Sequence, residues 1–514
     1  MTVGAFAKRS AVLGVAGLLA CDGGQSLLTN DRVPGDPYPS SIGGAGNVVG
    51  SAAFASGGLD GSSTASYYPV GIGGTGIVGQ GGSATISDSG VETDADSGVP
   101  PKLIGAPLIF TPTTSGFGLN AVLAQGVPSQ LKASVRKQSS RVWQSPLSPT
   151  SPALDLAQWM FSGLEPGQEY EYQVENASDE QAAPLYLGSA TTQRESGATF
   201  TFGLLTDSHI EPPDAVYTGP GPEQTLRSVA SDIGSAHPDF MINMGDMLDF
   251  HTAFGFNGAP TDSAYVRGAY MRYRSALGDA LGNAAHFPVI GNWEGENGCF
   301  TADQIELARS QRLLYVPGPT PDTYPQSGSS AQDYYAFTWG DALFVVLNVM
   351  SYTTTVHLLD AGEPGAPDDW TLGEAQMAWL QETLEKANSK WRFLFIHHTV
   401  GGAAGDYDNS AYGRGGGQAA HVGEQAVVHQ LMQQYGVQIF FYGHDHVFTD
   451  MVVDGIHYTL PGSAGAPWKF SSSETGYSSY WTDSGYGRVE VGPTAVDVQF
   501  VASGGNVIYE YQIP

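Results

Sequence analysis

The sequence contains little cysteine and little positive charge, and each shortage excludes a class of protein. Cys21 and Cys299 are the only cysteines among 514 residues, so the chain is not a disulfide-rich scaffold. Lysine and arginine total 21 against 51 acidic residues, which gives a formal net charge of −30 at pH 7. A chain this acidic repels phosphate backbones at long range, so we expect no nucleic acid as a stable partner. The hydrophobic content of 41% is nevertheless ample for globular cores.

The first 20 residues have the composition of a signal peptide. Lys8 and Arg9 lie in a short N-terminal region without acidic residues, and residues 11–20 (AVLGVAGLLA) are apolar and uncharged. This apolar run is too short to span a bilayer, which favours a secretory signal peptide over a transmembrane helix. Residues 18–21 (LLAC) resemble the bacterial lipobox, and this resemblance implies cleavage before Cys21 and lipidation of its thiol.

The lipobox resemblance also predicts where the protein is found. A lipidated Cys21 would anchor the chain in the membrane, outside the cytoplasm, in a bacterial cell envelope. The alternative is an ordinary secreted protein in which a cysteine happens to follow the cleavage site. Residues 21–100 are rich in glycine, serine and alanine and show no helix or strand periodicity, so we expect a disordered linker after the lipidated cysteine.

Residues 101–195 contain short apolar or alternating runs separated by proline, glycine and serine, without a long helical pattern. This pattern favours a small all-β sandwich domain. Its strongest signal is the segment 163–174 (GLEPGQEYEYQV), in which a Pro-Gly pair predicts a turn. Tyr170, Tyr172 and Val174 then alternate with polar residues, as in a half-buried strand. The segment resembles the Leu-x-Pro-Gly-x-x-Tyr corner of fibronectin type III-like domains, so we expect such a domain here.

Residues 196–514 show a different pattern, in which apolar runs of strand length alternate with longer polar or helical segments. Continuous runs of this kind are typical of the buried sheets of an α/β domain. They are residues 200–206, 240–244, 287–290, 343–348, 393–396 and 437–442. One helix is predicted at 371–387, where Thr371 and Glu374 have capping-box spacing, and another at 424–435, where a glycine follows.

Acidic, amide and histidine side chains follow five of these runs, where each expected strand ends. All twelve histidines lie at or after position 209. Because open α/β sheets hold their ligand sites at the carboxyl ends of the strands, we expect these side chains to lie close together. Carboxylate, imidazole and amide ligands without thiolate suit Zn, Mn, Fe or Co. The segments are Asp207-Ser208-His209, Gly245-Asp246-Met247-Leu248-Asp249, Gly291-Asn292-Trp293-Glu294, His397-His398 and Gly443-His444-Asp445-His446.

In chain order these segments read DxH, GDxxD, GNxE, HH and GHxH, and the set resembles the calcineurin-like metallophosphoesterases over residues 198–514. The β domain in front adds a likeness to purple acid phosphatases and alkaline phosphatase D-like enzymes. The resemblance implies a four-layer α/β/β/α sandwich and two divalent or trivalent metal ions, which would be Fe, Zn or Mn. It also implies hydrolysis of small phosphate esters, by a phosphomonoesterase or a phosphodiesterase.

The same resemblance assigns metal ligands, residue by residue. One metal ion is expected on Asp207, His209, Asp246 and His446. The second is expected on Asp246, Asn292, His397 and His444, so that Asp246 bridges the two ions. His398 is the competing ligand in the histidine doublet, and His397 is preferred.

Trp293 is a departure from the family pattern. The family usually has a histidine here, which is thought to steady the nucleophile or protonate the leaving group, and tryptophan can do neither. We therefore expect His421, in the glycine-rich segment 401–423, or His398 to take this catalytic role. Trp293 also supports an alternative function, that of a non-catalytic binding or adhesion lipoprotein that retains the phosphoesterase fold. Asp249 stands where purple acid phosphatases place the tyrosine that colours their ferric site, so no purple chromophore is expected.

Overall fold

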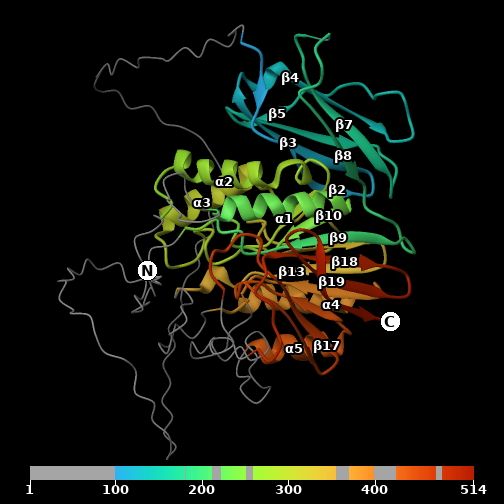
Figure 1. The fold of residues 1–514 in the computed structure, drawn as a ribbon, viewed down its shortest axis with the longest axis vertical. Helices are drawn as coiled ribbons and strands as arrows, with labels where there is room; N and C mark the ends of the chain where they lie inside the picture. Colours follow the sequence, from blue (N-terminus) through green and yellow to red (C-terminus); the bar gives the residue numbers. More distant parts are fainter. Residues whose placement is uncertain are drawn as a thin grey trace, which may run out of the picture. The chain divides into compact units, whose positions relative to one another are not determined.

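The computed structural model describes residues 99–179, 181–210, 221–250, 259–354, 370–398, 424–469 and 477–514 (Figure 1). The signal peptide predicted at 1–20, the lipidation predicted at Cys21 and the linker as far as residue 98 lie outside the described residues. His421 lies outside them as well. In the part of the chain that is described, no helix is both long and apolar enough to cross a membrane.

The all-β region precedes the α/β domain, as the sequence predicts, and consists of two antiparallel sheets. Tyr170, Tyr172 and Val174 are buried and alternate with more exposed neighbours, so the predicted half-buried strand is confirmed. They share a core with Leu119 and Trp159 of the other sheet. One sheet contains β1 (Lys102–Leu103), β2 (Leu108–Thr113), β3 (Gly116–Gln125), β5 (Thr150–Ala153) and β6 (Leu156–Ser162), and the other contains β4 (Leu131–Lys137), β7 (Glu169–Asn176) and β8 (Tyr186–Thr191).

The turn that leads into β7 is stabilised by a hydrogen bond to Tyr170. The hydroxyl of Tyr170 accepts a hydrogen bond of 2.9 Å from the backbone N–H of Glu165. Between them, Gly167 has a φ of 62°, a conformation that glycine adopts without steric cost. This is the hydrogen bond that a tyrosine corner makes, and it explains why this segment carries the strongest local signal. The fibronectin type III-like assignment stays a prediction.

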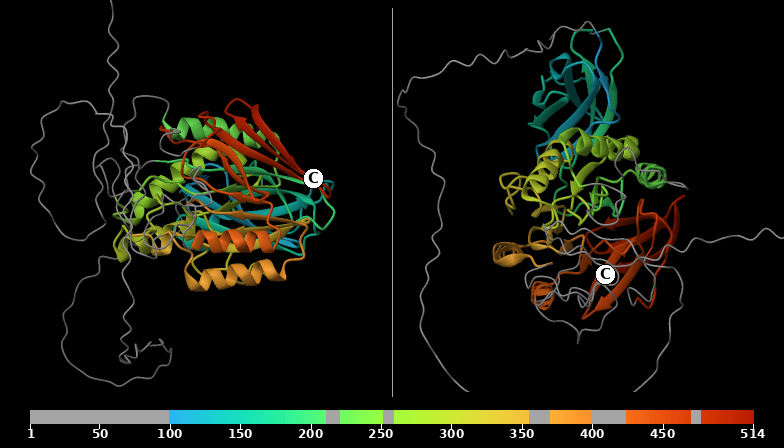
Figure 2. Two further views of the ribbon diagram at one scale, coloured as in Figure 1. Left: turned by 90° about the horizontal axis from the view of Figure 1, so that it is seen from below. Right: turned by 90° about the vertical axis from the view of Figure 1, so that its left-hand side faces the viewer.

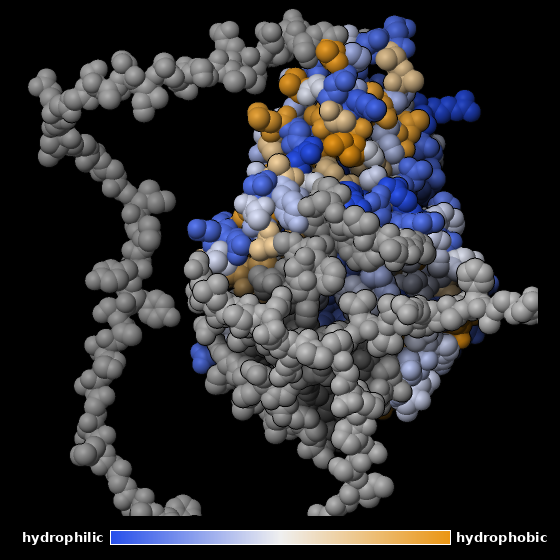
Figure 3. All heavy atoms as spheres, turned by 60° about the vertical axis from the view of Figure 1, so that its left-hand side comes forward, coloured by the Kyte–Doolittle hydropathy of each residue, from blue (hydrophilic) through white to orange (hydrophobic). Residues whose placement is uncertain are grey.

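Apolar side chains also reach the surface of the all-β region (Figure 3). Successive residues of a strand face opposite sides of the sheet, so Trp159 and Phe161 of β6 are buried whereas Met160 is 58% exposed. Single exposed apolar residues of this kind are common on soluble domains and indicate no binding site by themselves.

The α/β domain contains two six-stranded sheets. The first has the strand order β11-β10-β9-β18-β19-β20, and the second has the order β12-β13-β14-β15-β17-β16. The strands of the first are β9 (Phe200–Leu205), β10 (Phe240–Asn243), β11 (Ala285–Pro288), β18 (Gly485–Val491), β19 (Val496–Ala502) and β20 (Asn506–Ile513). Those of the second are β12 (Tyr335–Trp339), β13 (Ala342–Val346), β14 (Trp391–Phe395), β15 (Ile439–Phe441), β16 (Phe448–Val453) and β17 (Ile456–Pro461).

The two sheets pack face to face through aromatic side chains. The ring centroid of Phe344 in the second sheet lies 5.2 Å from that of Phe202 and 5.3 Å from that of Phe240 in the first. Both contacts are edge-to-face, an arrangement that aromatic quadrupoles favour. The apolar strand runs predicted from the sequence therefore build the core between the sheets.

Helices cover the outer faces of both sheets (Figures 1 and 2). Ile233 of α1 packs in one core with Met241 of β10, and Leu380 of α4 packs in another with Leu343 of β13. The order helix, sheet, sheet, helix confirms the predicted four-layer α/β/β/α sandwich. The helices are α1 (Pro222–Ala236), α2 (Ser263–Leu277), α3 (Ala302–Tyr315), α4 (Gly373–Lys386) and α5 (Glu424–Gln434), with short 3₁₀ turns η1 (Pro128–Gln130), η2 (Gly278–Ala280) and η3 (Met350–Tyr352).

Helix α4 begins later than its sequence indicates. The spacing of Thr371 and Glu374 predicts a capping box, but the helix begins at Gly373 and Leu372 is its N-cap. Leu372 is buried in the core beneath the helix. The packing of this apolar side chain, rather than the capping signal, sets the start of the helix.

Buried polar contacts join the all-β region to the α/β domain. Arg274 of α2 is fully buried and donates hydrogen bonds to the side-chain oxygen of Asn120 at 2.6 Å and to its backbone carbonyl at 2.8 Å. The hydroxyl of Tyr172 donates to the carbonyl of Gly282 at 2.7 Å. A buried charge without a hydrogen-bond partner destabilises the folded protein. The stability of each region therefore depends on its contact with the other region at Arg274.

Candidate metal centre

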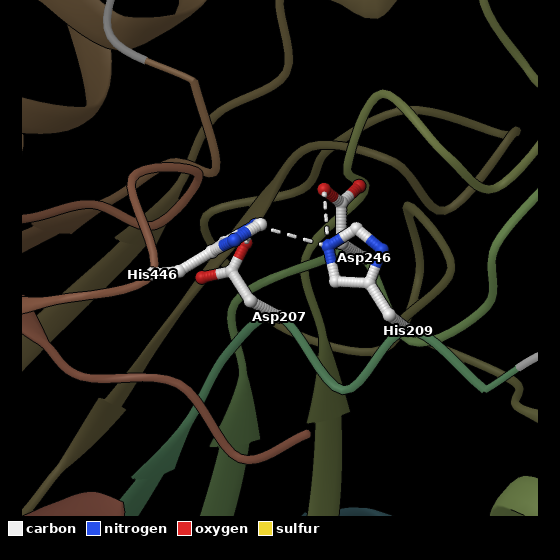
Figure 4. A group of neighbouring side chains, drawn as sticks. All are labelled: Asp207, His209, Asp246 and His446. Carbon is white, nitrogen blue, oxygen red and sulfur yellow. Dashed lines mark hydrogen bonds and ion pairs between the residues drawn. The ribbon is translucent and has the colours of Figure 1, made fainter. Parts of the chain in front are cut away.

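Four of the predicted ligands meet where strands of the two sheets end (Figure 4). Asp207 and His209 follow β9, Asp246 follows β10, and His446 follows β15 from the second sheet. His209 Nε2 lies 3.0 Å from His446 Nε2 and 3.5 Å from Asp246 Oδ2. His446 Nε2 lies 3.4 Å from Asp207 Oδ1. All four side chains are buried, so their nitrogen and oxygen atoms converge in a region shielded from water.

A second group of ligand atoms shares Asp246 with the first. His397 Nε2 lies 3.0 Å from Asp246 Oδ2 and 3.0 Å from Asn292 Oδ1. Asn292 Oδ1 also lies 3.0 Å from His444 Nδ1. The structure therefore brings all seven residues predicted as ligands together, in two groups that meet at Asp246.

The arrangement fits two metal ions. Ligand atoms about 2.1 Å from one ion, at tetrahedral or octahedral angles, lie roughly 3.0–3.4 Å from one another. The contacts described above, at 3.0–3.5 Å, are close to this spacing. His397 Nδ1 donates to the carbonyl of Met244 at 2.8 Å, and His446 Nδ1 donates to that of Trp468 at 3.1 Å. These bonds leave both Nε2 atoms as acceptors. With both Nε2 atoms as acceptors, the buried Asp246 Oδ2 receives no hydrogen bond from these histidines, and a cation would satisfy it.

The electrostatics of the centre also favour cations. Burial raises the pKa of Asp207 to about 6, and Asp246 adds to this against the opposing effect of His397. Burial alone would lower the pKa of His397, but the carboxylates of Asp246 and Asp207, with Glu294, raise it to about 9. The buried carboxylates thus bring negative charges close together, and a bound cation would reduce the repulsion between them.

Glu294 holds two of the ligand turns together. Its carboxylate accepts hydrogen bonds from the backbone N–H groups of Gly291 at 2.6 Å, Met247 at 2.5 Å and Asp246 at 3.2 Å. Burial, with the charge of Asp246, raises the pKa of Glu294 to about 8. One carboxylate thereby joins the turn that carries Asn292 to the turn that carries Asp246.

The glycines of the motifs are required by close contacts at this centre. A Cβ atom on Gly291 would lie 2.2 Å from Asp246 Oδ1. A Cβ atom on Gly245, whose φ is 98°, would lie 2.7 Å from His397 Nδ1. The glycine before each ligand therefore lets a ligand from another turn approach.

Five of the seven predicted ligand residues have backbone conformations that side chains disfavour. Their φ angles are positive: Asp207 53°, His209 47°, Asp246 51°, His444 78° and His446 58°. A non-glycine residue in this region costs roughly 1–2 kcal/mol. Backbone strain is therefore concentrated at the candidate metal centre, as is common at functional sites.

This strain has a measurable consequence at Asp207. Both Asp207→Gly and Asp207→Ala remove the carboxylate, but glycine alone accepts the φ of 53° without strain. In metal-free protein we expect the glycine variant to be more stable than the alanine variant by about 1 kcal/mol, measured by urea unfolding. Gln381 is the control, since it lies exposed inside α4, where glycine should instead be less stable than alanine by about 1 kcal/mol. Equal stabilities of the two Asp207 variants would contradict the strain.

The other residues singled out in the sequence surround this centre. The ring of His398 stacks on Trp370 at 3.8 Å and lies 4.5 Å from the ring of His444, so His397 and not His398 joins the ligand group. The catalytic role of His398 stays a prediction. The ring of Trp293 lies edge-on to His209 at 5.6 Å, and its backbone N–H donates to Asp246 Oδ1 at 2.9 Å. Asp249 Oδ1 lies 3.7 Å from His209 Nδ1.

The sequence analysis assigned no role to Trp468, which the structure places at the centre. Its carbonyl orients His446, and its ring lies 4.7 Å from that of His209. It follows β17 in a glycine-containing turn, and no local pattern distinguishes it from a surface aromatic residue.

Comparison with known proteins supports the fold and the family. Residues 200–448 match the calcineurin-like phosphoesterase family. The structure is similar to that of PhoD, with a TM-score of 0.62 and 15% sequence identity, over 81% of this chain and 91% of that chain. GAP50, described as the anchor in the inner membrane complex of Plasmodium, has 15% identity over 61% of this chain and 88% of its own, but its TM-score of 0.37 is too low to support an argument. Comparison with curated proteins gives no match.

Proposed function

Residues 200–448 are a calcineurin-like phosphoesterase domain, and from this premise we propose that the protein hydrolyses small phosphate monoesters or diesters with two metal ions at the candidate metal centre. The observation that carries the proposal is the position of Asp246 Oδ2, which lies 3.0 Å from His397 Nε2 and 3.5 Å from His209 Nε2. One carboxylate oxygen between two ligand groups is the arrangement that a two-metal phosphoesterase needs.

The residues of the chain would position the reaction. Asp207, His209 and His446 would hold one ion, Asn292, His397 and His444 the other, and Asp246 both. When bound, two such ions supply Lewis acidity toward the phosphoryl oxygens and the attacking water. The carbonyls of Met244 and Trp468 keep His397 and His446 in the orientation and tautomer that ligation requires.

Removal of the metal tests this proposal. We expect the protein to hydrolyse p-nitrophenyl phosphate or its diester, bis(p-nitrophenyl) phosphate, and to lose that activity after chelation. Reloading with Mn, Zn or Fe should restore it, and the better of the two substrates would assign the ester class. Undiminished hydrolysis by protein shown to be metal-free would refute the proposal.

The second candidate function is non-catalytic binding or adhesion by a protein that retains the phosphoesterase fold. It is favoured by Trp293, which replaces the family's histidine and packs against His209. Its expected signature is two bound metal ions, measured by elemental analysis, without hydrolysis of either ester. All seven predicted ligands lie together in the structure, which favours catalysis over a site that has lost its function.

The proposal includes a lipid anchor in a bacterial cell envelope. Its support is the sequence at residues 18–21, a leucine, leucine and alanine before Cys21, after a short apolar run. Expressed in a bacterium, the full chain should partition into the detergent phase of a cloud-point extraction, and Cys21→Ser should move it to the aqueous phase. Aqueous partitioning of both forms would exclude the anchor.

A further inference from the structure

Lys469 has a buried ammonium group for which the described part of the structure shows no hydrogen-bond partner. Its Nζ atom is inaccessible to solvent and makes no hydrogen bond to any residue that the structure describes. Burying an unpaired ammonium group costs several kcal/mol, so such a group is usually paired or serves to bind something. Lys469 is not among the seven predicted metal ligands, and the reaction as described above does not use it.

The segment before Lys469 is docked on the metal centre. The backbone N–H groups of Gly465 and Ala466 donate to the carbonyl of Asp207 at 3.1 and 2.9 Å. The packing is so close that a Cβ atom on Gly465 would lie 2.0 Å from the carbonyl oxygen of Ser208. Next in the chain, Trp468 accepts a hydrogen bond from His446 and packs against the ring of His209. Lys469 therefore directly follows a segment that packs against the turn containing Asp207.

The charges around Lys469 also favour a role for its ammonium group at the metal centre. Asp207 and Asp483 are the acidic groups whose fields act on its ammonium, and its charge acts in turn on His446. Burial lowers the pKa of Lys469 to about 8, and the two acids oppose this shift. Asp207 is a predicted metal ligand, so an ion there would take up its negative charge. The ammonium would then face less negative charge from the protein and could bind an anion, with Asp483 as its remaining acidic neighbour among the described residues.

We propose that Lys469 is a catalytic residue that binds a phosphoryl oxygen of the substrate beside the metal centre. This inference rests on the proposed function. A lysine suits the role because its ammonium is a compact charge with three donors, which can meet an oxygen of a tetrahedral phosphate from one side. It also supplies positive charge in a site where tryptophan replaces a histidine of the family.

The test measures binding of inorganic phosphate to the metal-loaded full chain by titration calorimetry, and so does not depend on turnover. Lys469→Gln should raise the Kd for phosphate about 10- to 100-fold, the value of one charge-assisted hydrogen bond. Metal content should stay unchanged and the melting temperature should not fall, because the lost group makes no hydrogen bond in the part of the chain that the structure describes. Lys469→Arg should recover part of the affinity. Lys386→Gln is the control, since Lys386 is exposed and paired with Glu382 on α4, and it should bind phosphate as the wild type does.

Two results would overturn the role of Lys469. One is an unchanged Kd for phosphate in Lys469→Gln, and the other is loss of metal or of folding in both Lys469 variants, which would make the residue structural. These results differ from a failure of the proposed function. Ester hydrolysis with unchanged phosphate affinity in Lys469→Gln would refute only the role of the lysine. Lysine-dependent phosphate binding without ester hydrolysis would refute only the proposed catalysis.

Discussion

Asp246→Ala is expected to release both metal ions and to lower kcat/KM by at least about 10³-fold, since the two-metal centre supplies several kcal/mol of transition-state stabilisation. The reason is geometric. Asp246 Oδ2 lies within 3.5 Å of His209 Nε2 in one ligand group and within 3.0 Å of His397 Nε2 in the other. Among the residues that the structure describes, Asp246 alone is common to both groups, so its removal should weaken both at once.

Asn292→Ala is the matched comparison for this variant. Among the described residues, Asn292 Oδ1 makes hydrogen-bond contacts with His397 and His444, both in the second group, so its loss should weaken mainly one ion. Elemental analysis should find less than one metal ion per chain in Asp246→Ala and between one and two in Asn292→Ala. Circular dichroism should show that both fold, because the centre lies beyond the strand ends and outside the aromatic core. Two ions bound to Asp246→Ala would mean that the site is wrongly assigned.

Glu294→Ala is expected to lower the free energy of unfolding by about 3–5 kcal/mol, although Glu294 is not a predicted ligand. Its carboxylate satisfies the backbone N–H groups of Gly291, Asp246 and Met247, and each buried donor left without a partner costs about 1–3 kcal/mol. Because these donors lie in the turns that hold Asn292 and Asp246, metal affinity should also fall about 10- to 100-fold.

Urea unfolding and metal titration measure these two effects. Glu374→Ala is the control, because Glu374 is exposed in the first turn of α4 and its loss should change stability by no more than about 0.5 kcal/mol. Full stability of Glu294→Ala would show that water replaces the carboxylate. Unchanged metal affinity would show that the two ligand turns hold their positions without it.

The strands and the types of ligand could be predicted from local pattern. The apolar run at 200–206 corresponds to β9, and the alternation of Tyr170, Tyr172 and Val174 corresponds to the buried face of β7. Which residues of a strand are buried follows from the spacing of apolar residues over a few neighbouring positions, so it can be predicted from the local sequence. Because parallel strands bring their carboxyl ends to one edge, the position of Asp207 and Asp246 after β9 and β10 also predicted that they meet.

The choice between His397 and His398 was decided only by the tertiary structure. Both lie in the bend that follows β14, and although the family resemblance favours His397, the two adjacent histidines cannot be told apart from local pattern. The packing directs His397 Nε2 to Asp246 and Asn292, and it stacks His398 on Trp370. The start of α4 was likewise decided by packing, because Leu372 is held in the core below the helix.

The sequence by itself predicted the four-layer fold, the order of the motifs and a set of candidate ligand residues. Only the tertiary structure showed that Glu294 joins two ligand turns and that Trp468 lies at the candidate metal centre. The partners of these residues are far away in the chain, since Glu294 reaches Met247 and Trp468 reaches His446 and His209. Secondary structure follows from short-range periodicity, but a hydrogen bond between distant turns exists only after the two sheets have packed, and no local pattern encodes it.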